Sequence, residues 1–150
     1  MHGSVRDMYT KVQVVFDAAD PGKLASFWAL VLGYVEEPPP PGFGSWEEFA
    51  RSIGMSEENF GDQAALIDPA GEGPRLYFQR VPEGKTAKNR VHLDVRVATR
   101  EVQGTERERL VEERVAELLG AGATLAWRVD EARGKAVALR DPEGNEFCVA

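Results

Sequence analysis

Two heptapeptides of the same pattern, ALIDPAG at residues 65–71 and ALRDPEG at residues 138–144, constrain the fold of this chain more than any other feature. Five of their seven positions are identical, and each heptapeptide lies between two segments with the composition of β-strands. Asp-Pro-x-Gly favours a chain reversal, so such a turn can recur by chance. Because both copies fall at the same place in the order of predicted elements, the pattern favours an internal duplication. We therefore expect two related modules.

The first module opens with a predicted strand and a helix. KVQVVFD at residues 11–17 alternates between apolar and polar side chains, as a half-buried strand requires. Asp20 supplies an acceptor at the helix N-cap, and Pro21 suits the first helical position. Strands at residues 65–67 and 75–81 then form a hairpin around the first heptapeptide. The apolar face of the helix comprises Leu24, Phe27, Trp28 and Val31.

The second module repeats this order. VHLDVRV at residues 91–97 alternates in the same way as the first strand. Thr105 and Glu108 have the spacing of a capping box, and the helix that they begin ends at Gly120. The remaining strands have the sequences TLAWRV, KAVALRD and NEFCVA.

We expect one domain that consists of a module at about residues 11–81, a bridge at residues 82–90 and a module at about residues 91–150. The bridge is rich in turn formers, and we expect its lysines to be solvated. An insert at residues 36–63 interrupts the first module, and its four consecutive prolines exclude a helix or a central strand there. The aromatic residues of the insert, Trp46 among them, form either a lid over a ligand or a local core.

Charge and composition exclude several classes of protein. The formal net charge of −7 provides no basic surface for nucleic acid or for an anionic membrane. No run approaches the roughly 20 apolar residues of a spanning helix, and the first ten residues lack the apolar region of a signal peptide. Cys148 is the only cysteine, so no disulfide forms within the chain. We expect a cytoplasmic protein with a small-molecule partner.

Three segments, VQVVFDAADPGKLASFWALVLGY, NRVHLDVRV and DPEGNEFCVA, resemble the glyoxalase/bleomycin-resistance/dioxygenase group, which is also called the vicinal oxygen chelate superfamily. The stretch FQRVPEGKTAKNRVHLDV is similar to glyoxalase-like proteins of actinobacteria. This resemblance implies an α+β fold in which two β-α-β-β-β modules form a curved mixed sheet around a cavity. It also implies a homodimer, and commonly a divalent metal ion held by four residues.

Carried over by position, the four ligand positions of the family fall on Gln13, Tyr77, His92 and Cys148. The family commonly has glutamates where this chain has Tyr77 and Cys148, so both carboxylates that would neutralise the ion are missing. We therefore expect no metal or other cofactor. Glu146 shares a face with Cys148 and is an alternative carboxylate, but a surface charge after the turn is the favoured interpretation.

His92 is the first candidate for a functional residue, because it lies on the polar face of a strand whose other face is continuous Val and Leu. The hypothesis gives His92 a catalytic role in proton exchange, with Tyr77 polarising a substrate oxygen. Hydrogen bonding of a neutral His92 to a neighbour is the structural alternative. The predicted ligand-binding residues are Gln13, Trp46, Tyr77, Gln79, His92, Asp94 and Cys148.

Two functions follow from the resemblance. One is an enzyme that acts on a small organic molecule in the cavity between the modules, as a lyase, isomerase or oxygenase without the usual metal set. The other is a non-catalytic protein of the bleomycin-resistance type, which sequesters a drug or metabolite. The acidic charge and the aromatic insert favour the second slightly, and the missing carboxylates do not separate the two.

Overall fold

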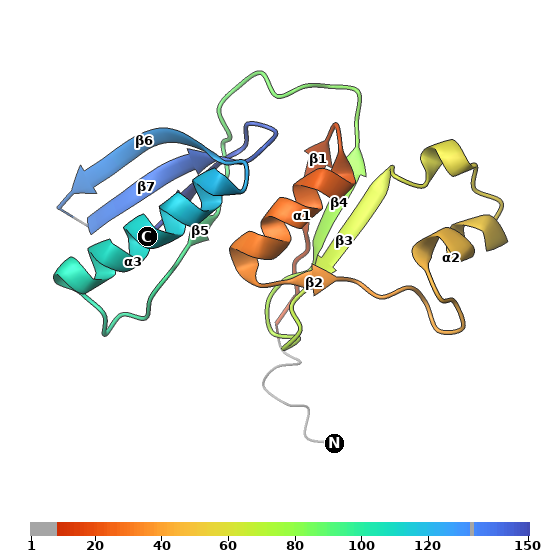
Figure 1. Cartoon of the computed structure of the whole chain (residues 1–150), viewed down its shortest axis with the longest axis horizontal. Helices are drawn as coiled ribbons and strands as arrows, with labels where there is room; N and C mark the ends of the chain where they lie inside the picture. The colour runs from red at the N-terminus through yellow and green to blue at the C-terminus, as the bar shows by residue number, and fades with distance from the viewer. Residues whose placement is uncertain (1–8, 133) are drawn as a thin grey trace. The chain divides into compact units, whose positions relative to one another are not determined.

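The computed structural model describes residues 9–132 and 134–150 (Figure 1). Most of the first ten residues, to which the expectation about a signal peptide refers, lie outside the described residues. The chain divides into two compact units. The first contains the described residues up to Ala25 together with Gly33–Val81, and the second contains Ser26–Leu32 and Pro82–Ala150. Each unit has a four-stranded mixed sheet, so the α+β class predicted from the sequence is confirmed.

The sheet of the first unit has the strand order β1-β4-β3-β2 (Figure 1). Strands β1 and β4 are parallel, whereas β3 pairs antiparallel with both β4 and β2. Strand β1 begins at Val14, three residues later than the strand predicted at residues 11–17, so Gln13 lies just before it. The elements are β1 (Val14–Ala18), α1 (Pro21–Leu32), β2 (Val35–Glu36), α2 (Trp46–Ser52), a 3₁₀ turn (Glu57–Asn59), β3 (Gln63–Ile67) and β4 (Leu76–Arg80).

The sheet of the second unit has the matching order β5-β8-β7-β6, again with a parallel pair at one edge. The predicted strand at residues 91–97 is regular only at Asp94 and Val95. The predicted capping box at Thr105 is wrong, because the N-cap of α3 is Gln103, two residues earlier, and the Gln103 side chain makes no capping hydrogen bond. The elements are β5 (Asp94–Val95), α3 (Gly104–Gly120), β6 (Thr124–Glu131), β7 (Gly134–Arg140) and β8 (Glu146–Val149).

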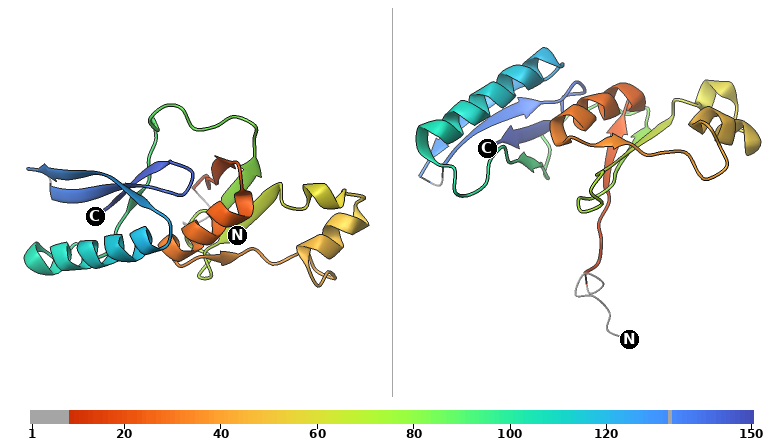
Figure 2. Two further views of the ribbon diagram at one scale, coloured as in Figure 1. Left: turned by 45° about the horizontal axis from the view of Figure 1, so that its top comes forward. Right: turned by 60° about the horizontal axis from the view of Figure 1, so that its bottom comes forward.

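One face of the second sheet is packed and the other carries polar groups. Helix α3 lies along the packed face, as both views of Figure 2 show. Phe147 on this face packs against Trp28 of α1, with ring centroids 4.9 Å apart. On the packed face, the buried side chains are Val111, Val115 and Leu118 of α3 and Val95, Val137, Leu139, Phe147 and Val149 of the sheet. The opposite face of the sheet carries Asp94 and Cys148.

The two heptapeptides form the same turn. Asp68 Oδ1 accepts a hydrogen bond from the Ala70 N–H at 2.8 Å, and Asp141 Oδ1 accepts the equivalent bond from the Glu143 N–H at 2.9 Å. The glycine three residues after each aspartate has a positive φ, 72° at Gly71 and 89° at Gly144. An L side chain rarely adopts that conformation, which explains why both copies have glycine there. The shared turn geometry supports the duplication.

The aromatic insert forms a local cluster. Phe43 and Trp46 both contact the ring of Phe49 edge-on, with centroid distances of 5.2 and 5.9 Å. Ser45 caps α2 by accepting a hydrogen bond from the Glu48 N–H at 3.0 Å. Of the two interpretations of the insert, this packing favours the local core. Within the described part of the chain, no helix combines the length and apolarity needed to cross a membrane.

Candidate functional site

A single row of residues crosses the polar face of the second sheet. The strand register places Asp94 opposite Cys148, Cys148 opposite Ala138, and Ala138 opposite Trp127. Residues directly opposite one another in neighbouring strands have side chains on the same face. The sheet therefore brings together two residues predicted from the sequence, Asp94 and Cys148, with Trp127, which was not predicted. We call the four residues Asp94, Cys148, Ala138 and Trp127 the second-sheet row.

His92 joins one end of this row. Its Nε2 lies 3.3 Å from Asp94 Oδ1, and the two side chains are 45% and 57% exposed. One ligand-type atom each from His92, Asp94 and Cys148 lies within 4.8 Å of the other two. Burial raises the pKa of the Cys148 thiol, and the negative charge of Asp94 raises it further, while Lys88 acts in the opposite direction. The thiol is therefore protonated at neutral pH, which agrees with a strand residue rather than a nucleophile.

Lys88 and Trp127 meet at the other end of the row. The Lys88 ammonium lies 5.7 Å from the centroid of the Trp127 indole, and the indole side chain remains 39% exposed. A cation over an aromatic face is attracted by the quadrupole of the ring. Lys88 remains exposed, which agrees with the predicted solvated bridge residue, and its ammonium also lies over this indole.

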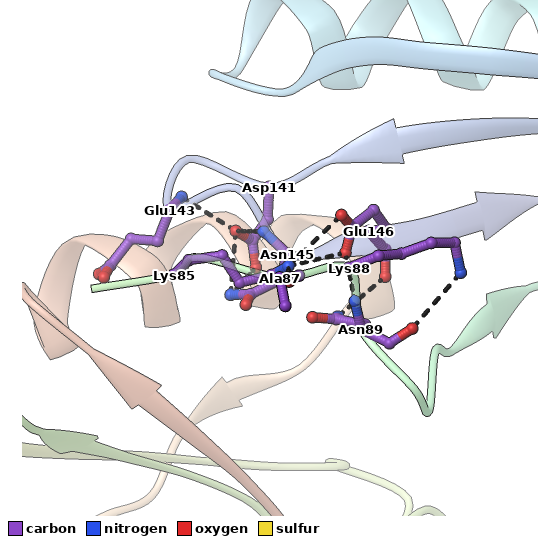
Figure 3. A network of polar contacts seen from close by, with 8 residues as sticks. All are labelled: Lys85, Ala87, Lys88, Asn89, Asp141, Glu143, Asn145 and Glu146. Carbon is purple, nitrogen blue, oxygen red and sulfur yellow. Dashed lines mark hydrogen bonds and ion pairs between the residues drawn. The ribbon is translucent and has the colours of Figure 1, made fainter. Parts of the chain in front are cut away.

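Glu146 is a second contact between the bridge and the sheet (Figure 3). Its carboxylate lies 3.1 Å from Lys85 Nζ and accepts a hydrogen bond from the Asn89 N–H at 3.0 Å, and its side chain is only 9% exposed. Burial raises the pKa of Glu146, but the hydrogen bonds from Asn89, from its own N–H and from Lys85 outweigh burial and lower the pKa to about 2. The predictions of a solvated Lys85 and of a surface charge at Glu146 are therefore both wrong. The Lys85 ammonium already balances this carboxylate, which makes Glu146 a poor metal ligand.

In the first unit, Arg75 occupies the position between Gln13 and Tyr77. Its Nη1 donates to Gln13 Oε1 at 2.7 Å, and its guanidinium carbon lies 5.4 Å from the centroid of the Tyr77 ring. Its Nε and Nη2 donate to the two carboxylate oxygens of Glu37 at 2.7 and 2.8 Å. Trp46 Nε1 donates to the backbone oxygen of Glu37 at 2.6 Å, so the insert is tied to the same network. Gln79 lies outside it and donates to Asp17 at 2.8 Å.

These contacts bear on the metal ion that the family resemblance implies. The side-chain oxygen of Gln13 is already bonded to a guanidinium, and that cation also lies over the Tyr77 ring. The guanidinium is itself paired with both carboxylate oxygens of Glu37, so that carboxylate is not free to offset the charge of a divalent cation held by two neutral donors. The first-unit residues therefore do not fit the usual four-ligand metal set, for a reason that the missing carboxylates alone did not show.

Sequence reasoning missed Arg75, Glu37, Trp127 and Lys88 as members of these two faces. Arg75 precedes Tyr77 by two residues in one extended segment, so the period of two could have placed them on one face. Trp127 could have been found in the same way only if the register of β6 had been known. Nothing in the bridge sequence indicates that Lys88 lies over an indole.

The repeated strand order and the two polar sheet faces define a protein of the glyoxalase-like class. The family described as "Glyoxalase-like domain" matches residues 13–150, and the chain belongs to this family. This match confirms the superfamily inferred from the sequence. No curated protein matches the chain.

Several solved structures have a similar fold. A glyoxalase/bleomycin resistance protein/dioxygenase family enzyme from Burkholderia phytofirmans is 20% identical, with a TM-score of 0.59 and coverage of 91% of this chain and 94% of that chain. A fosfomycin resistance protein from Listeria monocytogenes, in complex with Mn(II) and a dihydroxypropylphosphonic acid, is 10% identical, with a TM-score of 0.57 and coverage of 91% and 85%. The bleomycin-binding protein from Streptomyces verticillus, in complex with copper(II)-bleomycin, is 20% identical, with a TM-score of 0.50 and coverage of 95% of both chains. At these identities the likeness shows the fold alone.

Proposed function

We propose that this protein binds a small organic molecule on the second-sheet row and acts as a sequestering protein. The observation that carries the proposal is the exposed indole of Trp127, which shares its row with Asp94 and, through Asp94, with His92. Binding sites for small molecules combine aromatic surface with a few polar groups that fix orientation. The second-sheet row has both, and the charge of Lys88 lies beside them.

The composition of the row indicates the class of ligand. A planar aromatic group can stack on the indole of Trp127, with Lys88 either displaced from the ring or paired with an anionic substituent. The His92–Asp94 pair offers an acceptor and a donor at the other end. Among the similar folds, the Streptomyces verticillus protein is in complex with copper(II)-bleomycin, and the Listeria monocytogenes protein is in complex with a dihydroxypropylphosphonic acid.

Tryptophan fluorescence tests the proposal after a thermal-shift screen of aromatic metabolites and antibiotics, bleomycin included. The chain has three tryptophans, of which Trp28 is buried and Trp127 is the most exposed. A ligand that stacks on Trp127 should quench its emission. Trp127→Ala should abolish that quenching and weaken binding by about 2 kcal/mol, roughly 30-fold, because stacking aromatics are strong contributors to affinity.

Trp46→Phe is the matched control, because it alters the other partly exposed tryptophan in the first unit. It should leave the affinity unchanged. If Trp46→Phe abolishes binding and Trp127→Ala does not, the ligand belongs to the insert, as a lid would require, and the second-sheet proposal is wrong.

A second candidate, metal-independent acid–base catalysis, rests on the 3.3 Å contact between His92 Nε2 and Asp94 Oδ1. A carboxylate at this distance can orient an imidazole, as a general base requires. Tyr77 remains a proposed partner that polarises a substrate oxygen. Turnover of a bound ligand that is lost in His92→Ala, with affinity retained, would favour catalysis over sequestration.

We also propose that the two units work as one glyoxalase-like domain in a cytoplasmic homodimer. The family resemblance supports the dimer. Light scattering of the purified chain should give twice the 16.5 kDa mass of one copy, and a monomeric mass would contradict this.

A further inference from the structure

We propose that Lys88 makes the second-sheet row selective for planar aromatic molecules that carry an acidic group, such as aromatic carboxylates. This inference rests on the proposed function, because it concerns the ligand of the same row, and it adds the charge of that ligand and the residue that selects it. A ring that stacks on the Trp127 indole moves the Lys88 ammonium aside in every case. Only an acidic substituent on that ring gives the displaced ammonium a charged partner.

The two lysines of the bridge differ in what neutralises them. Lys85 Nζ lies 3.1 Å from the Glu146 carboxylate and is paired with it. Among the described residues, no carboxylate forms an ion pair with Lys88. Its ammonium lies 5.7 Å from the centroid of the Trp127 indole and 3.4 Å from the backbone oxygen of Asn89. Lys88 therefore presents a positive charge without a carboxylate partner beside exposed aromatic surface.

A buried carboxylate fixes the backbone on both sides of Lys88 (Figure 3). Glu146 accepts a hydrogen bond from the Asn89 N–H at 3.0 Å, and its backbone oxygen accepts one from the Asn89 side-chain amide at 3.3 Å. Lys85, which is paired with Glu146, also donates to the backbone oxygen of Ala87. Because both chain neighbours of Lys88 are held, its side chain can move without the backbone, and the ordering cost of binding stays small. Glu146 is thus a positioning residue for Lys88.

The charges along the row determine how such a ligand is oriented. Burial and Asp94 raise the pKa of the Cys148 thiol and Lys88 lowers it, so the ammonium acts at Cys148 as well as at Trp127. Asp94 and Trp127 are three strand intervals apart, roughly 14 Å, which exceeds the Debye length of about 8 Å at physiological ionic strength. The exposed Asp94 carboxylate therefore repels an acidic group at Lys88 only weakly. The acidic group should lie toward the bridge, and a hydrogen-bond donor of the ligand toward Asp94.

Isothermal titration calorimetry with naphthoate and naphthamide, substituted at the same ring position, tests the inference because the two probes differ in charge and share a ring system. We expect the wild-type chain to bind the carboxylate about tenfold more tightly than the carboxamide, through a charge-assisted hydrogen bond. Lys88→Met should abolish this preference by weakening the carboxylate alone, and Lys88→Arg should retain it. Lys23→Met is the matched control, because it removes an exposed lysine of the first unit and should change neither affinity.

Glu146→Gln tests the positioning role. Glutamine is close to glutamate in shape and can still accept from the Asn89 N–H, but it cannot form an ion pair with Lys85. We expect the preference for the carboxylate to fall to about threefold, because a loosened bridge has to be ordered on binding, with the carboxamide affinity unchanged. A general loss of stability would affect both probes alike, so the ratio of the two affinities reports on Lys88. An unchanged ratio would overturn the positioning role of Glu146.

The outcomes separate this inference from the proposed function. If Trp127→Ala weakens both probes while Lys88→Met changes neither, the row binds aromatic molecules without selecting their charge. The proposed function then stands and the inference is wrong. Wild-type protein that binds neither probe, although ligands from the screen quench Trp127, contradicts the inference in the same way. If both probes bind and Trp127→Ala changes neither affinity, they bind outside the row, and the proposed function fails together with the inference.

Discussion

The two units share a scaffold and differ in the chemistry of their polar faces. Both sheets have a parallel pair at one edge followed by antiparallel strands, and both use the same aspartate-centred turn. In the first unit, Arg75 ties Gln13 and Glu37 together and lies over Tyr77. In the second unit, the corresponding face holds a cluster of ligand-type groups around Cys148.

This difference shows which features a duplicated module retains. The turn depends on backbone hydrogen bonds to one carboxylate and on a glycine with positive φ, so few substitutions are tolerated. Side chains on the polar face contribute little to the core and are free to diverge. In the first unit this face carries the Arg75–Glu37 ion pair, and in the second unit it carries the cluster of His92, Asp94 and Cys148.

The largest expected effect concerns the two turns. Asp141 is 3% exposed and accepts hydrogen bonds from the Glu143 and Asn145 N–H groups and, at 3.0 Å, from the buried Trp28 indole N–H. Asp141→Ala should lower the free energy of unfolding by about 3 kcal/mol, because it removes a buried acceptor that several donors share. Urea denaturation followed by circular dichroism measures this loss.

Asp68→Ala is the matched variant in the first unit. Asp68 accepts the equivalent backbone hydrogen bonds from the Ala70 and Glu72 N–H groups and one more from the Gly73 N–H, all within its own turn. Water can replace the carboxylate there, so the loss should be clearly smaller. Equal losses for the two variants would mean that the turn alone, and not its burial against α1, determines the contribution of the aspartate.

Part of the fold and of the candidate site could be predicted from the sequence. The repeated heptapeptide predicted the turns, and the spacing of Leu24, Phe27, Trp28 and Val31 predicted the buried face of α1, because local patterns of period 3.6 and short turn motifs carry that information. The family resemblance placed His92 and Cys148 in one ligand set, but it did not include Asp94 in that set. The pairing of Asp94 with Cys148 depends on the register of β5 against β8, which no local pattern specifies. The ion pairs of Lys85 and Arg75 join residues 61 and 38 positions away in the chain.

A second comparison concerns these two ion pairs. The Lys85 and Glu146 side chains are 23% and 9% exposed, whereas the Arg75 and Glu37 side chains are 35% and 25% exposed. Lys85→Met should cost about 2 kcal/mol, because it leaves a buried carboxylate without its cation, while Arg75→Met should cost about 1 kcal/mol at the more hydrated pair. Thermal or urea unfolding of both variants gives the ranking. A larger cost for Arg75→Met would indicate that its network supports the whole first unit.

The smallest effect is a pH dependence of the first-unit ion pair. Hydrogen bonds from Arg75 lower the pKa of Glu37 below its usual 4.5, against the effect of burial, and the positive charge of Arg75 adds to the lowering. A carboxylate with a depressed folded-state pKa contributes stability that is complete above its unfolded-state pKa and is lost as the pH falls through the folded-state value. Glu37→Gln should therefore be less stable than wild type at pH 7, and the difference should narrow below about pH 4.5. Arg75→Met removes the same pair from the other side and should show the same narrowing. If the deficit of either variant stays constant into acid, the guanidinium of Arg75 acts at this position through its packing on Tyr77 rather than through its charge.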